Sequence, residues 1–420
     1  MLIQFNFKNF KSFKKETSFD MTAVSIKEHA YNLIDDIDTS DKYLRVAAIY
    51  GANASGKSNM IEAFRFMQLF VVTSLKNDRL DGESEETKIP IKCYSFDYES
   101  KDNPSLFEVF FVEKDMEYQY GFIVDRNKIY EEWLYTKKAK AKKYKPLFYR
   151  QQSEIKCEKD FKEAEKFKDS LQEKTLFVSL LAQTKIEKAR DVYMWFVKSS
   201  VMSFGDVRYE SILSKISNTA KKLEDDSYRA KLEDFLIAID TGILGVRVEE
   251  IMTDTKPTYK IYTKHRVKDS DRLEEIPISE ESSGTQKMFL LFNFFSIALS
   301  NGCLLFVDEM DAKLHPLLIR YIVTMFHNKS INTTNAQLVY STHDVSNLTR
   351  DLFRRDQIWF VEKDELGVST LYSLVEYNLD ETTRVRNDAT YNKDYITGRY
   401  GAIPLLKEFV VVEVDEHSGK

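Results

Sequence analysis

Hydrophobic and polar residues alternate in several segments of the chain, and this alternation predicts β-strands. Within residues 1–20, hydrophobic side chains recur between Leu2 and Phe13 among polar neighbours. The same pattern returns in residues 89–135 and in residues 243–263. Short apolar runs predict further strands at residues 45–50, 303–307, 337–341 and 357–361.

Other segments carry hydrophobic residues at helical spacing. One follows the run at 45–50, where the recurring positions are Met60, Ile61, Phe64, Met67 and Phe70. Residues 150–240 have a helical character, with a highly charged part at 160–174 and an amphipathic part at 175–196. Further helices are predicted at 286–299 and at about 316–327, whereas the polar, acidic segment 76–88 predicts a loop.

This order of elements predicts an α/β fold with two β-containing lobes. Residues 1–150, with a mixed β-sheet, and residues 241–420, a second α/β lobe, would flank a helical insertion at residues 151–240. The insertion lacks sustained heptads, so a long coiled coil is not expected. No internal repeat is evident.

Composition limits the class of protein. The chain has 420 residues, of which 43% are hydrophobic and 30% charged, as in a soluble globular protein. A net charge of −6 argues against a generally basic nucleic-acid coat. Cys93, Cys157 and Cys303 are scattered without metal-ligand spacing, so reduced thiols and no structural zinc are expected. Neither a secretory signal nor an apolar stretch of membrane-spanning length is evident, which predicts a cytoplasmic protein with no membrane partner.

The segment Gly51–Ser58 has the pattern G-x-x-x-x-G-K-S of a phosphate-binding loop (P-loop). It stands between a predicted strand and a predicted helix, the context that such a loop requires. Its backbone N–H groups and the helix N-terminus would hold phosphate oxygens. The candidate nucleotide-binding residues here are Gly51, Asn53, Ala54, Ser55, Gly56, Lys57, Ser58 and Asn59. Lys57 would reach the β- and γ-phosphates, and Ser58 would hold Mg²⁺.

Two carboxylates follow the apolar run at 303–307. Asp308 would bind Mg²⁺ through water, and Glu309 would act as the base that polarises the attacking water. The alternative is that both residues only cap the next helix.

Two further segments contain candidate phosphate contacts. Ser283 and Gly284 precede a predicted helix and could bind an anion at its N-terminus, although a Ser-rich N-cap would explain them equally well. His343 follows the strand predicted at 337–341, and its place after the other motifs favours a contact with the γ-phosphate over a structural role.

These motifs, in this order, resemble the head of ABC-type ATPases. The opening FKNFKSFKK and the stretch DEMDAKLHP are similar to the RecF and SMC branch. Within it, YGANASGKSN and YITGRYGAIP resemble the stand-alone ATPases of abortive-infection and anti-phage defence systems. The resemblance implies an ABC-type P-loop ATPase head that binds and hydrolyses ATP with Mg²⁺. The absence of an N-K-x-D motif also favours ATP over GTP.

The same resemblance implies roles for individual residues. Lys57, Glu309 and His343 would be catalytic, with His343 as the switch histidine. Asp311 would lie where the D-loop crosses a dimer interface. Ser283 and Gly284 would form the signature motif, which contacts the γ-phosphate in the partner subunit. Thr285 departs from the usual signature, in which a second Gly is common.

The implied assembly is a homodimer, or a higher homo-oligomer, with nucleotide sites shared between chains. It would regulate a separate effector, a nuclease or a toxin. Two alternatives stay open: a RecF-type DNA-repair ATPase that binds DNA itself, and an ATP-stabilised scaffold with little turnover. A basic run at residues 137–145 could contact nucleic acid, or it could be a solvated hairpin tip.

Overall fold

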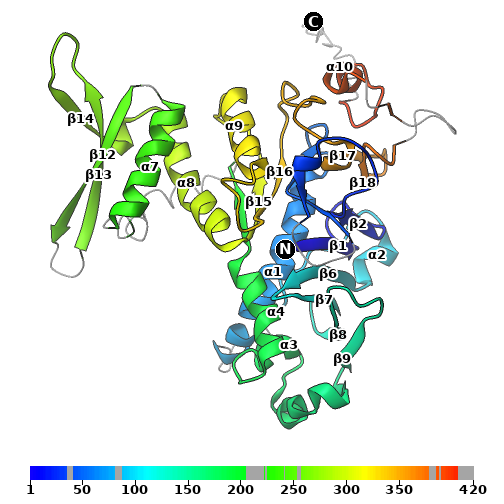
Figure 1. Ribbon diagram of the computed structural model, residues 1–420. Helices are drawn as coiled ribbons and strands as arrows, with labels where there is room; N and C mark the ends of the chain where they lie inside the picture. The colour runs from blue at the N-terminus through cyan, green and yellow to red at the C-terminus, as the bar shows by residue number, and fades with distance from the viewer. Residues whose placement is uncertain are drawn as a thin grey trace, which may run out of the picture.

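The fold is described from a computed structural model of the chain. The described residues are 1–35, 41–80, 88–204, 222, 225–240, 242–252, 257–377, 385–386 and 389–404. These residues form two large sheets and a three-stranded sheet that lies apart from them (Figure 1). Their buried apolar side chains gather in three hydrophobic cores.

The first sheet has seven strands and is antiparallel throughout. Its order is β10-β9-β8-β7-β6-β1-β2. The strands are β1 (Leu2–Lys8), β2 (Thr17–Asp20), β6 (Ser105–Glu113), β7 (Met116–Val124), β8 (Ile129–Lys138), β9 (Lys145–Gln151) and β10 (Glu154–Cys157). Strands β6 to β10 follow one another as neighbours, which is the simplest way to pair consecutive strands.

The second sheet has six strands in the order β11-β15-β16-β5-β17-β18. All its pairs are parallel except the hairpin β17–β18. The strands are β5 (Val46–Tyr50), β11 (Ser200–Ser203), β15 (Leu304–Asp308), β16 (Gln337–Ser341), β17 (Ile358–Lys363) and β18 (Ser369–Ser373). The four consecutive members β15, β16, β5 and β17 are parallel, so their carboxyl ends lie at one edge of the sheet.

Helix α1 (Lys57–Leu80) lies between the two sheets. The ring of Phe64 on α1 stacks on Phe306 of the six-stranded sheet at 4.5 Å and meets Phe5 of the seven-stranded sheet edge-on at 5.5 Å. Helices α3 (Phe177–Leu181) and α4 (Glu187–Lys198) pack against α1 in the same core. One face of the six-stranded sheet is thus covered by α1.

The opposite face of that sheet belongs to a second core. Ala47 and Ile49 of β5 lie in the first core, whereas Val46, Ala48 and Tyr50 lie in the second, as the two-residue period of a strand requires. Helices α7 (Asp226–Ile239), α8 (Ser283–Asn301) and α9 (Pro316–His327) contribute to this second core.

A three-stranded antiparallel sheet stands apart from both large sheets (Figure 1). It consists of β12 (Ile243–Met252), β13 (Pro257–Arg266) and β14 (Leu273–Pro277). It contacts α7, which packs on α8. The smaller elements are β3 (Leu33–Ile34), β4 (Tyr43–Leu44), α2 (Tyr98–Asp102), α10 (Tyr391–Ile396) and the 3-10 turns η1 (Ala30–Asn32), η2 (Lys159–Ser170), η3 (Ile278–Glu280) and η4 (Arg355–Gln357).

The structure differs from the sequence-based expectations in several helical segments. Helix α1 continues to Leu80, into the segment 76–88 expected to be a loop, and residues 81–87 of that segment lie outside the described residues. The charged part at 160–174 is largely 3-10 helix, and the amphipathic part at 175–196 is divided into α3 and α4. The expected helical insertion also contains β10 and β11, and β11 joins the six-stranded sheet. The division into domains stays a prediction.

Among the described residues, none of the helices combines the length and the apolar character needed to cross a bilayer.

Candidate nucleotide-binding site

The P-loop connects β5 to α1 at the carboxyl edge of the six-stranded sheet. A side-chain Cβ at Gly51 would lie 2.4 Å from the carbonyl oxygen of Val361, and one at Gly56 would lie 2.4 Å from the hydroxyl of Ser369. Both glycines also have positive φ angles, 154° and 121°. The close approach of β17 and β18 to the loop therefore requires glycine at both positions.

Lys57 lies at the base of the P-loop and is only 5% exposed. Its ammonium donates hydrogen bonds to the carbonyl oxygens of Gly51 at 2.8 Å and Ala52 at 3.0 Å. Burial lowers the pKa of Lys57 to about 8, although the carboxylates of Asp308, Asp311 and Glu309 partly oppose this effect. The protein therefore holds the partly desolvated positive charge of Lys57 at a place where a bound phosphate would supply negative charge.

Residues at the carboxyl ends of four parallel strands, β5, β15, β16 and β17, line one cavity of about 470 Å³. The lining residues are Asn53, Ala54, Ser55, Gly56, Lys57, Ser58, Asn59, Glu309, His343 and Lys363. The structure thus brings together seven P-loop residues with Glu309, which follows β15, and His343, which follows β16. Lys363, at the end of β17, is an addition that sequence reasoning missed.

Asp308, the last residue of β15, and Glu309, which follows it, share one partner, Ser341. Its hydroxyl donates to Asp308 Oδ1 at 2.5 Å and accepts from the backbone N–H of Glu309 at 2.8 Å. Glu309 has a φ angle of 53°, an unfavourable value for a residue with a side chain. The next helix, α9, is capped by His315 instead, so the alternative of Asp308 and Glu309 as helix caps is wrong.

Asp311 connects this segment to the one that contains His343. Its Oδ2 accepts from the backbone N–H of His343 at 3.1 Å, while its buried Oδ1 has no hydrogen-bond partner in the described part of the chain. Burial lowers the pKa of His343, and the positive charge of Lys57 acts in the same direction. Both effects favour the neutral imidazole, while the carboxylates of Asp311, Glu309 and Asp308 act in the opposite direction.

Ser283 and Gly284 do not line this cavity. They form the first turn of α8, where Ser282 is the N-cap and accepts from the N–H of Thr285 at 3.1 Å. Ser283 is exposed, and its hydroxyl is not the cap. Thr285 stands where the usual signature often has a second Gly. Its hydroxyl donates a hydrogen bond to the Asp240 carboxylate at 3.2 Å, so the threonine has a local structural role.

Two serines from distant parts of the chain support the P-loop. The Ser369 hydroxyl donates to the carbonyl oxygen of Ser55 at 2.5 Å and lies 2.7 Å from the hydroxyl of Ser12. Ser12 in turn accepts from the Asn59 amide at 2.7 Å. Ser12, Ser341 and Ser369 were not predicted as site residues, because their contacts with the P-loop and with Asp308 join segments that are distant in the sequence.

The basic run at residues 137–145 forms the tip of the β8–β9 hairpin. Lys137 is bound by Glu117 at 2.8 Å and lies over the ring of Tyr144. The remaining lysines of the run, Lys138, Lys140, Lys142, Lys143 and Lys145, are exposed. The hairpin interpretation is confirmed, and nucleic-acid binding by this run stays a prediction.

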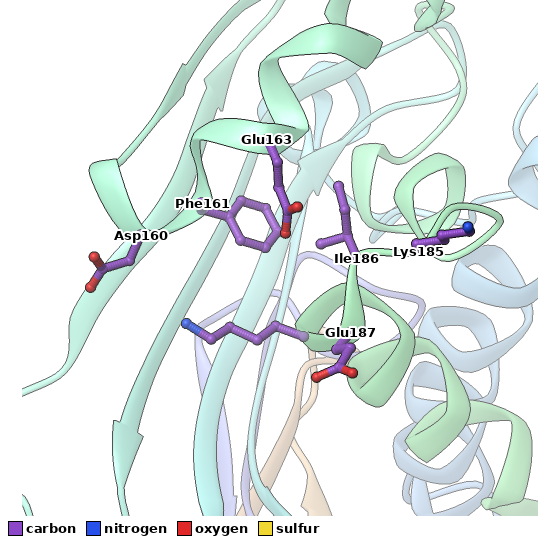
Figure 2. A pocket seen from close by; sticks show the side chains of 7 residues that line it. Asp160, Phe161, Glu163, Lys185, Ile186 and Glu187 are labelled. Atoms are coloured by element: carbon purple, nitrogen blue, oxygen red, sulfur yellow. The ribbon is translucent and has the colours of Figure 1, made fainter.

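A second cavity, of about 280 Å³, lies between η2 and the start of α4 (Figure 2). The ring of Phe161 points toward Ile186, with Glu163 and Glu187 nearby. The charged side chains that line this cavity are both acidic and basic, and none of the lining residues belongs to the P-loop. It is therefore separate from the candidate nucleotide site.

The fold and the cavity together define a P-loop nucleotide-binding protein. Residues 46–349 match the family model described as "AAA domain, putative AbiEii toxin, Type IV TA system". The chain belongs to this family. The predicted kinship with ABC-type ATPases of abortive-infection systems is thereby confirmed.

Solved structures were also compared with this chain. The SMC head domain from Thermotoga maritima is 15% identical, with a TM-score of 0.43, and the match covers 89% of this chain and 98% of that one. The SMC head solved in complex with the C-winged helix domain of ScpA is 14% identical, with a TM-score of 0.41, at 89% and 97% coverage. No curated protein shows a significant match.

Proposed function

We propose that the protein binds and hydrolyses ATP at the cavity formed by the P-loop, Glu309 and His343. The observation that carries this proposal is the convergence of a P-loop, a carboxylate and an imidazole at one edge of a parallel sheet. Open α/β sheets bind their ligands at this edge. The buried hydroxyl of Ser55, which has no hydrogen-bond partner in the described part of the chain, is a further polar group suited to a phosphate.

The residues present fit Mg²⁺ as a cofactor. Mg²⁺ prefers oxygen ligands and is commonly held by one or two protein groups together with nucleotide phosphates. Asp308 and Ser58 would hold it, and Ser341 fixes one oxygen of the Asp308 carboxylate. Within the described residues there is no cluster of three or more His, Cys, Asp or Glu side chains that could form a metal site without the nucleotide. Bound Mg²⁺ would neutralise charge on the phosphates.

The protein's own groups would perform the remaining steps. Lys57 would exchange its two carbonyl partners for phosphate oxygens. Glu309 would accept a proton from the attacking water, since its backbone is fixed by Ser341 and its side chain lines the cavity. His343 would donate a hydrogen bond from an imidazole nitrogen to the terminal phosphate.

We also propose that two chains share each nucleotide site. Ser283 is exposed at the N-terminus of α8 and lies outside the cavity of its own chain. A partner's α8 could therefore supply a second anion-binding helix end, in addition to the N-terminus of α1 in each cavity. ATP would favour the closed dimer, because the signature motif binds only the γ-phosphate, and a ligand shifts such an equilibrium by its differential affinity.

Mixing two inactive variants tests both parts of this proposal. Lys57→Ala and Ser283→Arg chains should each lack ATP turnover, while an equal mixture should regain up to about a quarter of it, because half the dimers would have one intact site of two. As a control, Lys57→Ala mixed with a chain carrying both substitutions contains no intact site and should stay inactive. An inactive mixture, with proven subunit exchange and an active wild type, would contradict the sharing of sites.

The ATP cycle would regulate a separate effector in anti-phage defence. The support is the family description, which refers to a toxin of a toxin–antitoxin system. The test is phage challenge of cells that carry the gene with its neighbouring genes. Lys57→Ala should abolish protection, whereas Lys159→Met, at an exposed position, should retain it. Full protection by the Lys57→Ala variant would contradict a role for the nucleotide site in defence.

A further inference from the structure

Lys363 is the one lining residue of the nucleotide cavity that belongs to neither the P-loop nor the motifs after β15 and β16. It is half-buried, and its ammonium forms no hydrogen bond or ion pair with any residue that the structure describes. A cation that lines a cavity without a protein partner can pair with an anionic group of a bound ligand. The side chain is therefore placed to bind an anionic ligand.

Strand register explains why Lys363 faces the P-loop. Along β17, Trp359 and Val361 lie in the first core and Phe360 in the second. Because side chains alternate along a strand, Lys363 lies on the same face as Val361, the face that α1 covers. Ser369, directly opposite Lys363 in the β17–β18 hairpin, hydrogen-bonds the P-loop from this face.

The order of strands places Lys363 at a particular end of the cavity. In the order β15-β16-β5-β17, Glu309 and His343 follow strands on one side of β5, and Lys363 ends the strand on the other side. The γ-phosphate has to lie near Glu309 and His343, where water would attack. The other phosphates then extend past the P-loop toward β17.

We propose that Lys363 binds the phosphate nearest the nucleoside, the α-phosphate of the bound nucleotide. The inference rests on the proposed function, because it presupposes that the cavity holds a nucleotide. Lys363 is then a ligand-binding residue whose contact is the same in ATP and ADP. His343, at the opposite end, contacts a phosphate that ADP lacks.

Isothermal titration calorimetry with Mg²⁺ and either ADP or the non-hydrolysable ATP analogue AMP-PNP tests this assignment. Lys363→Met should weaken both ligands by the same factor of about ten, which corresponds to about 1.4 kcal/mol. Lys363→Arg should restore most of the affinity, and the loss should shrink at high salt. His343→Ala should weaken AMP-PNP more than ADP. Lys159→Met, which removes an exposed positive charge elsewhere, should change neither affinity.

Three results would overturn the inference. Unchanged affinity of Lys363→Met, with normal binding by the wild type, would exclude the contact and leave the proposed function intact. If Lys363→Met weakened the binding of AMP-PNP and left the binding of ADP unchanged, Lys363 would contact the γ-phosphate instead of the α-phosphate. Absence of binding by the wild-type protein would overturn the proposed function and this inference together.

Discussion

Replacement of Lys57 by methionine should stabilise the nucleotide-free protein at neutral pH, although it removes the cation that the P-loop needs for phosphate. The folded protein lowers the pKa of Lys57 from 10.5 to about 8, mainly through burial. At about 1.4 kcal/mol per pKa unit, holding this charge in the folded state at pH 7 costs about 3 kcal/mol.

The substitution also removes the hydrogen bonds from Lys57 to the carbonyl oxygens of Gly51 and Ala52. Each contributes about 1 kcal/mol. The expected net effect at pH 7 is therefore a gain of about 1 kcal/mol in the free energy of unfolding for Lys57→Met.

The sign of the effect should reverse with pH. Between pH 8 and 10.5, the folded state binds fewer protons at Lys57 than the unfolded state, so the wild type gains stability as the pH rises through this window. The methionine variant lacks this gain. It should be the more stable protein at pH 7 and the less stable one near pH 10.

Urea unfolding without nucleotide, at pH 7 and pH 10, measures this crossover. Lys159→Met is the matched control, because it removes an exposed lysine and should change the free energy of unfolding little at either pH. A Lys57→Met protein less stable than the wild type at pH 7, or a difference that does not change with pH, would refute the reasoning.

Two further predictions concern the catalytic carboxylate and the support of the P-loop. Glu309→Gln should reduce ATP turnover by about 10²- to 10⁴-fold while ATP still binds, because it removes the proposed base and keeps the shape of the side chain. Steady-state turnover measures the loss of hydrolysis, and calorimetry measures the binding of ATP. Near-normal turnover would exclude Glu309 as the base. Ser369→Ala should cost about 1–3 kcal/mol of stability and weaken nucleotide binding, since it removes the buried contact with Ser55. Thr370→Ala, at the exposed neighbouring position, is its control in denaturant unfolding and calorimetry, and equal effects of the two substitutions would argue against a specific role for Ser369.

The sequence predicted those parts of the site that are contiguous. Strands β5, β15 and β16 are short, mostly apolar runs that lead directly into the motifs, so each motif was visible with the strand that positions it. Helix α9 was predicted within its observed bounds because His315 and Pro316 form a recognisable helix start.

The missed features depend on contacts between distant segments or on single hydroxyl groups. Lys363 and Ser369 reach the P-loop only through pairing of β17 with β5, which no local pattern reveals. The break between α3 and α4 contains no Gly or Pro. There, the Thr184 hydroxyl bonds the carbonyl oxygen of Leu181 and the N–H of Ile186, which replaces helical hydrogen bonds.

The contact between Ser12, Ser55 and Ser369 has a consequence for the order of events during synthesis. The P-loop leaves the ribosome more than 300 residues before Ser369, which is separated from Ser55 by 314 positions. Until β17 and β18 emerge and pair with β5, the loop lacks the strand that packs against Gly51 and the serine that holds Ser55. Nascent chains that stop short of β18 would therefore carry the complete P-loop sequence without the contacts that hold the loop in its folded conformation.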